Sequence, residues 1–105
     1  MNYILIEKKT LREAIKEMVE KGIRPLTIEE IWKLKKEGNI KHQWYDSGTL
    51  WYQGKFKQIT FKQMKDIENI YADGGRLLCL GSGGGDGLGG NGNFDLNARI
   101  LGVKV

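Results

Sequence analysis

The chain has 105 residues, with 17 Lys and Arg against 13 Asp and Glu, a formal net charge of +4, and 15 glycines. This length suffices for one hydrophobic core and is too short for two, so we expect a single domain over residues 1–105. No apolar run approaches the roughly 20 residues that cross a bilayer. The start of the chain becomes charged too soon for a signal peptide, so the sequence predicts a soluble protein without a membrane span.

The chain contains one cysteine, Cys79, and one histidine, His42. A lone cysteine excludes an internal disulfide and a cysteine-rich zinc cluster. His42 has no serine or cysteine beside it in the sequence context of a nucleophile. Cys79 lies in an apolar run, where a thiol usually behaves as a small buried hydrophobe. We therefore predict a protein that is not an enzyme and binds no cofactor or metal.

The first part of the chain predicts a strand and two helices. Residues 2–7 are a strand candidate. Each helix begins at a capping-box pattern and ends near a glycine, over residues 10–22 and 27–38. The inward face of the second helix is expected to carry Ile31 and Trp32 among its apolar residues.

Residues 39–58 have the pattern of an aromatic hairpin with turns at residues 46–48 and 53–54. A third capping-box pattern at Thr60 predicts a helix that ends near Gly74. In so small a domain, aromatic side chains on short strands more often form part of the core than a surface on which bases or sugars stack, so we favour a core position. The aromatic residues concerned are Trp44, Tyr45, Trp51, Tyr52 and Phe56.

A glycine-rich segment separates the last apolar runs of the chain. Eight of the twelve residues from Gly81 to Gly92 are glycine. Because glycine adds no side chain to a core, we predict an exposed loop over residues 81–93. Short strands are expected over residues 77–80, 94–96 and 99–105, which completes an α+β domain. No helix follows the glycines to hold a pyrophosphate, so the match to a dinucleotide motif is rejected.

The acidic and amide side chains of this last region have two interpretations. Asp86 and Asp95, with nearby asparagine amides, have the oxygen ligands that calcium accepts from flexible loops. The same residue types are common in turns, and we favour that role.

An alternative function follows from the charge distribution. Most Lys and Arg residues precede residue 77, and none lies in residues 77–98. A small nucleic-acid-binding protein could use these cations together with the aromatic hairpin. The lysines concerned are Lys33, Lys35, Lys36, Lys41, Lys55 and Lys57.

Four stretches of the sequence, at residues 24–31, 44–49, 75–80 and 98–105, carry a family resemblance. They resemble compact C-type lectin-fold proteins, in particular the variable proteins of diversity-generating retroelements. The resemblance implies that the N- and C-terminal strands pair, residues 2–7 with residues 100–105, and that two helices flank the sheet. It also implies that the loop before the last strand displays a ligand-binding surface.

Such retroelements randomise adenines in asparagine-type codons, which cannot yield Lys, Glu, Gln, Met or Trp at varied positions. Residues 77–98 contain none of these five residue types. We therefore predict a non-enzymatic module that binds a protein or other macromolecular surface through residues 77–98. The residues expected to face the ligand are Cys79, Ser82, Gly84, Asp86, Leu88, Asn91 and Asn93.

Overall fold

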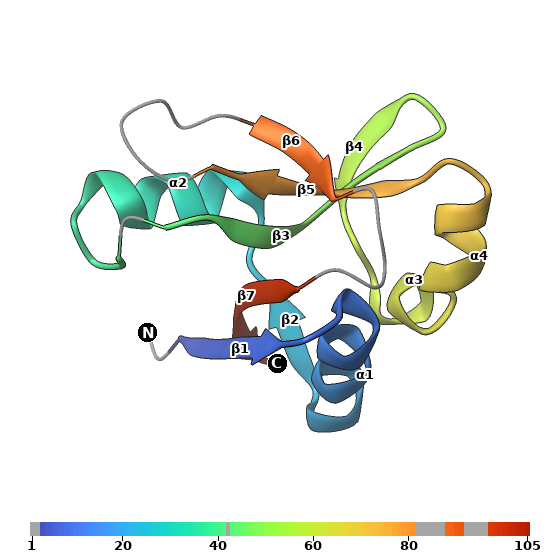
Figure 1. Cartoon of the computed structure of the whole chain (residues 1–105), viewed down its shortest axis with the longest axis horizontal. Coiled ribbons are helices and arrows are strands. Elements are labelled where there is room, and N and C mark those ends of the chain that lie inside the picture. The colour runs from blue at the N-terminus through green and yellow to red at the C-terminus, as the bar shows by residue number, and fades with distance from the viewer. Residues whose placement is uncertain (1–2, 42, 82–87, 92–96) are drawn as a thin grey trace.

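The computed structural model describes residues 3–41, 43–81, 88–91 and 97–105, with only the backbone of residues 88–91. Within these ranges, four helices lie against one sheet of seven strands (Figure 1). In chain order the elements are β1 (Ile4–Lys8), α1 (Leu11–Lys21), β2 (Ile23–Pro25), α2 (Ile28–Lys36), β3 (Tyr45–Tyr52), β4 (Lys55–Gln58), α3 (Phe61–Lys65), α4 (Ile67–Ala72), β5 (Arg76–Leu80), β6 (Leu88–Asn91) and β7 (Ala98–Lys104).

The last strand, β7, lies inside the sheet, whose strand order is β1-β7-β3-β5-β6. β1 runs antiparallel to β7 with Ile4 opposite Gly102, whereas β3 runs parallel to it where Asp46 is opposite Ile100. β2 also pairs with β7, and β4 pairs with β3. The α+β class and the pairing of the N- and C-terminal strands are thus confirmed.

Local side-chain contacts explain where the first two helices start. The Thr10 hydroxyl accepts a hydrogen bond from the Glu13 backbone N–H at 3.1 Å. The capping box at the start of α2 is complete, because Thr27 and Glu30 each bond the other's backbone N–H. α1 ends at Gly22, whose φ of 65° is the left-handed conformation that glycine adopts without strain. The sequence therefore predicted both helices correctly.

The apolar core forms two clusters on opposite faces of the sheet. Leu50, Leu77 and Ile100 belong to the cluster beneath α1, α3 and α4. Tyr45 and Leu80 belong to the cluster beneath α2. β5 thus contributes one leucine to each cluster, so the strand that leads into the glycine-rich segment is anchored on both faces.

Two predicted boundaries around the helices and turns are wrong. The helix expected to run from Thr60 to Gly74 is interrupted at Asp66, which leaves the short helices α3 and α4. The turn expected at residues 46–48 is absent from the described chain, because β3 continues through these residues, with an irregularity in its pairing with β5 between Asp46 and Leu50. The second turn is confirmed: Gln53 and Gly54 have φ of 52° and 76°, which is typical of a two-residue hairpin loop.

The aromatic residues divide between core and surface. Tyr45 is 2% exposed, as the core prediction requires, but Trp51 is 38% and Phe56 60% exposed. Trp32 is 45% exposed, contrary to its expected inward position, and the Lys36 ammonium lies over its ring. The spacing of apolar residues in the sequence shows on which face of a strand or helix an aromatic side chain lies. Whether another helix or strand covers that face depends on the tertiary fold.

The loop predicted over residues 81–93 is not wholly a loop. Leu88–Asn91 forms β6 and pairs antiparallel with β5. A strand ladder uses backbone groups alone, so it can include glycines that have no side chain to pack. The strand expected over residues 94–96 lies outside the described residues.

Candidate functional site

Three of the predicted ligand-facing residues lie on two neighbouring strands. Cys79 is on β5 opposite Gly89, and Leu88 and Asn91 of β6 are in register with Leu80 and Leu77. The sheet therefore brings residues that are about ten positions apart in the sequence to within one strand spacing, about 5 Å. The other predicted ligand-facing residues, Ser82, Gly84, Asp86 and Asn93, lie outside the described residues, as do His42 and Asp95.

Lys35 fixes the point where the chain leaves β5. It lies in the last turn of α2, and its ammonium donates a hydrogen bond of 2.6 Å to the Gly81 carbonyl oxygen. The side chain is only 4% exposed, so Lys35 does not belong to the exposed basic surface expected from the sequence. A buried ammonium is costly unless it is hydrogen-bonded, which makes this contact a strong constraint.

Two hydroxyl groups fix β5 itself. The Ser47 hydroxyl is fully buried, donates to the Leu78 carbonyl oxygen at 2.8 Å and accepts from the Thr49 N–H at 3.0 Å. The Tyr71 hydroxyl accepts from the Leu77 N–H at 3.0 Å. Burial raises the pKa of Tyr71 to about 12, so this hydroxyl stays neutral at physiological pH.

A second set of contacts fixes the point where the chain returns to the sheet. The Arg99 N–H donates to the buried Asp46 carboxylate at 3.2 Å. The Arg99 guanidinium lies over the Trp44 ring, 4.5 Å from its centroid, and bonds the Glu7 carboxylate. Residues 82–97 therefore depart from and return to strands that buried polar groups hold in place.

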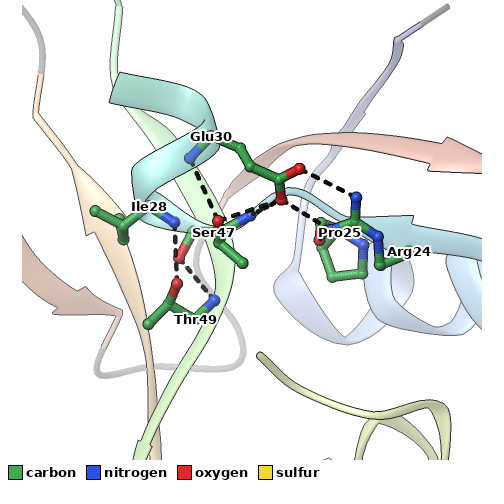
Figure 2. Close-up of polar contacts among 7 residues, drawn as sticks. Arg24, Pro25, Ile28, Glu30, Ser47 and Thr49 are labelled. Atoms are coloured by element: carbon green, nitrogen blue, oxygen red, sulfur yellow. Dashed lines mark hydrogen bonds and ion pairs between the residues drawn. The ribbon is translucent and has the colours of Figure 1, made fainter. Parts of the chain in front are cut away.

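A polar junction joins the start of α2 to β3 beside the site (Figure 2). The Arg24 guanidinium donates two hydrogen bonds to the Glu30 carboxylate, at 2.8 and 3.1 Å. The Thr49 hydroxyl accepts from the Ile28 N–H at 2.9 Å. The Arg24 bonds hold the pKa of Glu30 at about 2, well below its usual 4.5.

This junction predicts a pH-dependent stability. Because the folded pKa of Glu30 is below the unfolded one, its stabilising effect is complete above pH 4.5 and disappears as the pH falls toward 2. The two side chains are 25% and 37% exposed, so solvent screening limits the effect of Glu30→Gln to about 1 kcal/mol in the free energy of unfolding. Urea unfolding of the variant and the wild type should give this difference at neutral pH and no difference near the folded pKa. Equal curves at neutral pH would contradict it.

An open apolar groove lies between the start of α2 and the hairpin of β3 and β4. It has a volume of about 360 Å³, and among its lining residues are Ile28 of α2, Phe56 of β4 and Leu78 of β5. Trp51 is opposite Phe56 in register, and the two ring centroids are 4.4 Å apart. Gly90, which has no side chain, is opposite Leu78 on β6. We call this site the α2–β4 groove.

The lysines of the nucleic-acid alternative are spread over two regions. Lys33 and Lys36 are exposed on the last turns of α2, and Lys55 and Lys57 are exposed on β4. The end of α2 and the hairpin of β4 lie at opposite sides of the molecule (Figure 1). Among the described residues these lysines thus lie in two small groups, apart from Lys41, which is exposed between α2 and β3, and Lys35, which is buried.

No protein-family model, no curated protein and no solved structure matches the chain. The described helices include none with the length and apolarity required to cross a membrane.

Proposed function

We propose that the protein is a non-enzymatic binding module of the C-type lectin type, diversified by a retroelement. Its ligand is a protein or another macromolecular surface. Residues 77–98 supply the variable contacts, with Cys79, Ser82, Gly84, Asp86, Leu88, Asn91 and Asn93 facing the ligand.

The observation that carries this proposal is that residues 82–98, the part of the segment that follows β5, are held at both ends by Lys35 and Asp46, which lie outside the segment. Lys35 holds the Gly81 carbonyl oxygen, and the Asp46 carboxylate holds the Arg99 N–H. The Lys35 and Asp46 side chains thus both contact backbone atoms, the Gly81 carbonyl oxygen and the Arg99 N–H. Side chains between these points can therefore change without altering either anchor, which a display segment on a rigid scaffold requires.

The fold type is supported by its strand order. The first and last strands pair, α1 and α2 lie over different core clusters, and the glycine-rich segment precedes the last strand. These are the features that the sequence resemblance implies for C-type lectin-fold variable proteins. The β5–β6 pairing adds a backbone frame on which part of the variable segment is held.

Sequencing the gene in many copies from its natural population tests this function. Differences between copies should concentrate in the codons of the proposed ligand-facing residues and should occur where a nearby template copy has adenine. The codons of Lys35, Ser47 and Leu50, which lie outside residues 77–98, are the internal control and should remain constant. Differences spread evenly along the gene, or an invariant segment beside invariant controls, would contradict the proposal.

A further inference from the structure

β4 has an open outer edge. It pairs only with β3 in the described sheet. In a hairpin with a two-residue turn, the residues that flank the turn, here Tyr52 and Lys55, form a hydrogen-bonded pair, and every second pair after it is hydrogen-bonded as well. The Ile59 N–H, four residues after Lys55, fits this alternation because it donates to the Gly48 carbonyl oxygen at 2.8 Å. The alternate residues Phe56 and Gln58 must then direct their backbone N–H and C=O groups away from β3. These groups are available to pair with another strand.

Each face of this edge strand has its own hollow. The α2–β4 groove lies on the face of Phe56 and is mostly apolar, with Leu78 and Ile28 in its lining. A second hollow of about 200 Å³ lies on the other face and includes Lys55 and Lys57 in its lining, and Lys57 also borders the α2–β4 groove. An extended segment beside β4 would direct successive side chains alternately into the two hollows.

The charges on β4 itself favour an acidic partner on the lysine face, whereas Glu29 lines the α2–β4 groove on the other face. Lys55 and Lys57 are exposed, and neither forms an ion pair in the part of the chain that the structure describes. A strand that brings carboxylates to this face gains attraction, whereas a second lysine-bearing strand would be repelled. The same edge lysines disfavour pairing of two copies of β4.

We infer that the β4 edge binds an extended peptide whose side chains alternate between apolar and acidic. The peptide adds as a further strand beside Phe56 and Gln58, places its apolar side chains in the α2–β4 groove and its carboxylates near Lys55 and Lys57. Main-chain bonds supply affinity and the two hollows supply selectivity, as in other cases of strand addition. Of the described residues that line the two hollows, Leu78 alone falls within residues 77–98. Leu78 is not among the proposed ligand-facing residues, so the surface does not depend on their diversification.

The geometry favours a peptide over single-stranded nucleic acid. Base binding needs free ring faces with cations beside them for the phosphates. The Trp51 and Phe56 rings pack against each other with centroids 4.4 Å apart, which occupies part of both faces. Lys55 and Lys57 alternate with Phe56 along the strand, so their side chains leave from the opposite face.

Fluorescence anisotropy can measure binding of three labelled probes to the whole chain. The probes are a blocked peptide of alternating leucine and glutamate, the matching peptide of leucine and lysine, and a single-stranded oligothymidylate. The Leu–Glu peptide should bind with a Kd below about 1 mM, and the Leu–Lys peptide at least about tenfold more weakly. Absence of Leu–Glu binding, or tighter binding of the oligothymidylate that weakens steeply with salt, would overturn the proposal.

Charge reversal on β4 is the first variant test. Lys55→Glu with Lys57→Glu should weaken Leu–Glu binding by about tenfold or more and strengthen Leu–Lys binding. Lys62→Glu with Lys65→Glu on α3 changes the net charge equally at exposed positions and should change the Leu–Glu affinity less than about twofold. Equal effects of the two double variants would show a response to net charge alone and would contradict docking at β4.

Two substitutions at Phe56 separate the ring from the backbone. Phe56→Ala removes the ring, and Phe56→Pro also removes the outward N–H, a change that edge strands tolerate. Proline should weaken Leu–Glu binding about fivefold or more beyond alanine, since one main-chain bond is lost. Circular dichroism checks that both variants fold. Equal affinities of folded alanine and proline variants would overturn the strand-addition geometry, and the charge-reversal pair decides the matter if proline prevents folding.

Discussion

Replacing Gly102 with valine is expected to lower the free energy of unfolding by about 3 kcal/mol or more, because the site has no room for a side chain. Gly102 lies in β7 with Ile4 of β1 on one side and Pro25 of β2 on the other. A Cβ atom here would lie 2.5 Å from the Ile23 Cγ2 and 2.8 Å from the Arg24 carbonyl oxygen. Backbone oxygen in a paired strand cannot move away as a side-chain end can, so the sheet itself must shift.

Urea unfolding monitored by circular dichroism measures this loss. Lys104→Ala is the control in the same strand, because Lys104 is exposed and its substitution should change stability by less than about 0.5 kcal/mol. A Gly102→Val variant as stable as the control would mean that β2 and α1 do not pack on β7 as described.

Leu77→Ala is expected to lower the free energy of unfolding by about 2 to 5 kcal/mol, since it leaves a cavity in the larger core cluster. Leu77 is fully buried and lies in β5 beside Leu50 of β3. Its neighbour Leu78 is half-buried and faces the open α2–β4 groove. Leu78→Ala should therefore cost about 1 kcal/mol or less, because solvent fills the space left by the side chain.

Leu77 and Leu78 are also expected to differ in their effect on peptide binding. Leu78→Ala should weaken binding of the Leu–Glu peptide while the fold remains stable, because Leu78 lines the proposed apolar hollow. Thermal unfolding of the two variants side by side gives the stability contrast. Equal decreases in stability for Leu77→Ala and Leu78→Ala would contradict the assignment of Leu77 to the core and Leu78 to the groove.

Features that depend on near neighbours in the sequence could be predicted. The Thr27 and Glu30 capping box and the Gln53–Gly54 turn each involve residues within a few positions of one another. β2 was missed because three residues that include a proline carry no strand pattern of their own, and the strand forms only because β7 offers pairing groups. β6 was missed for the same reason, since its glycines gain strand structure from β5.

The candidate site could be predicted only in outline. The glycine composition marked the segment, but its anchors join residues that are far apart in the chain, such as Lys35 with Gly81 and Ser47 with Leu78. Helical spacing does distinguish Lys35 from Lys36, since Lys35 lies four residues after the buried Ile31 on the inward face of α2. Only the tertiary fold, however, places the Gly81 carbonyl oxygen where Lys35 can donate to it. Likewise, a pattern of rings on a hairpin does not tell whether α2 reaches far enough to cover Phe56.

The tolerance of the segment is tested most directly by the melting temperature of one multiple variant. It replaces Ser82, Gly84, Asp86 and Asn93 together with tyrosine and is compared with Leu77→Ala in the same buffer. Independent anchoring by Lys35 and Asp46 predicts a melting temperature within about 4 °C of the wild type, and a much larger fall for Leu77→Ala. A fall for the tyrosine variant as large as that of Leu77→Ala would show that the glycine-rich segment is part of the fold and would contradict its role as a variable binding surface.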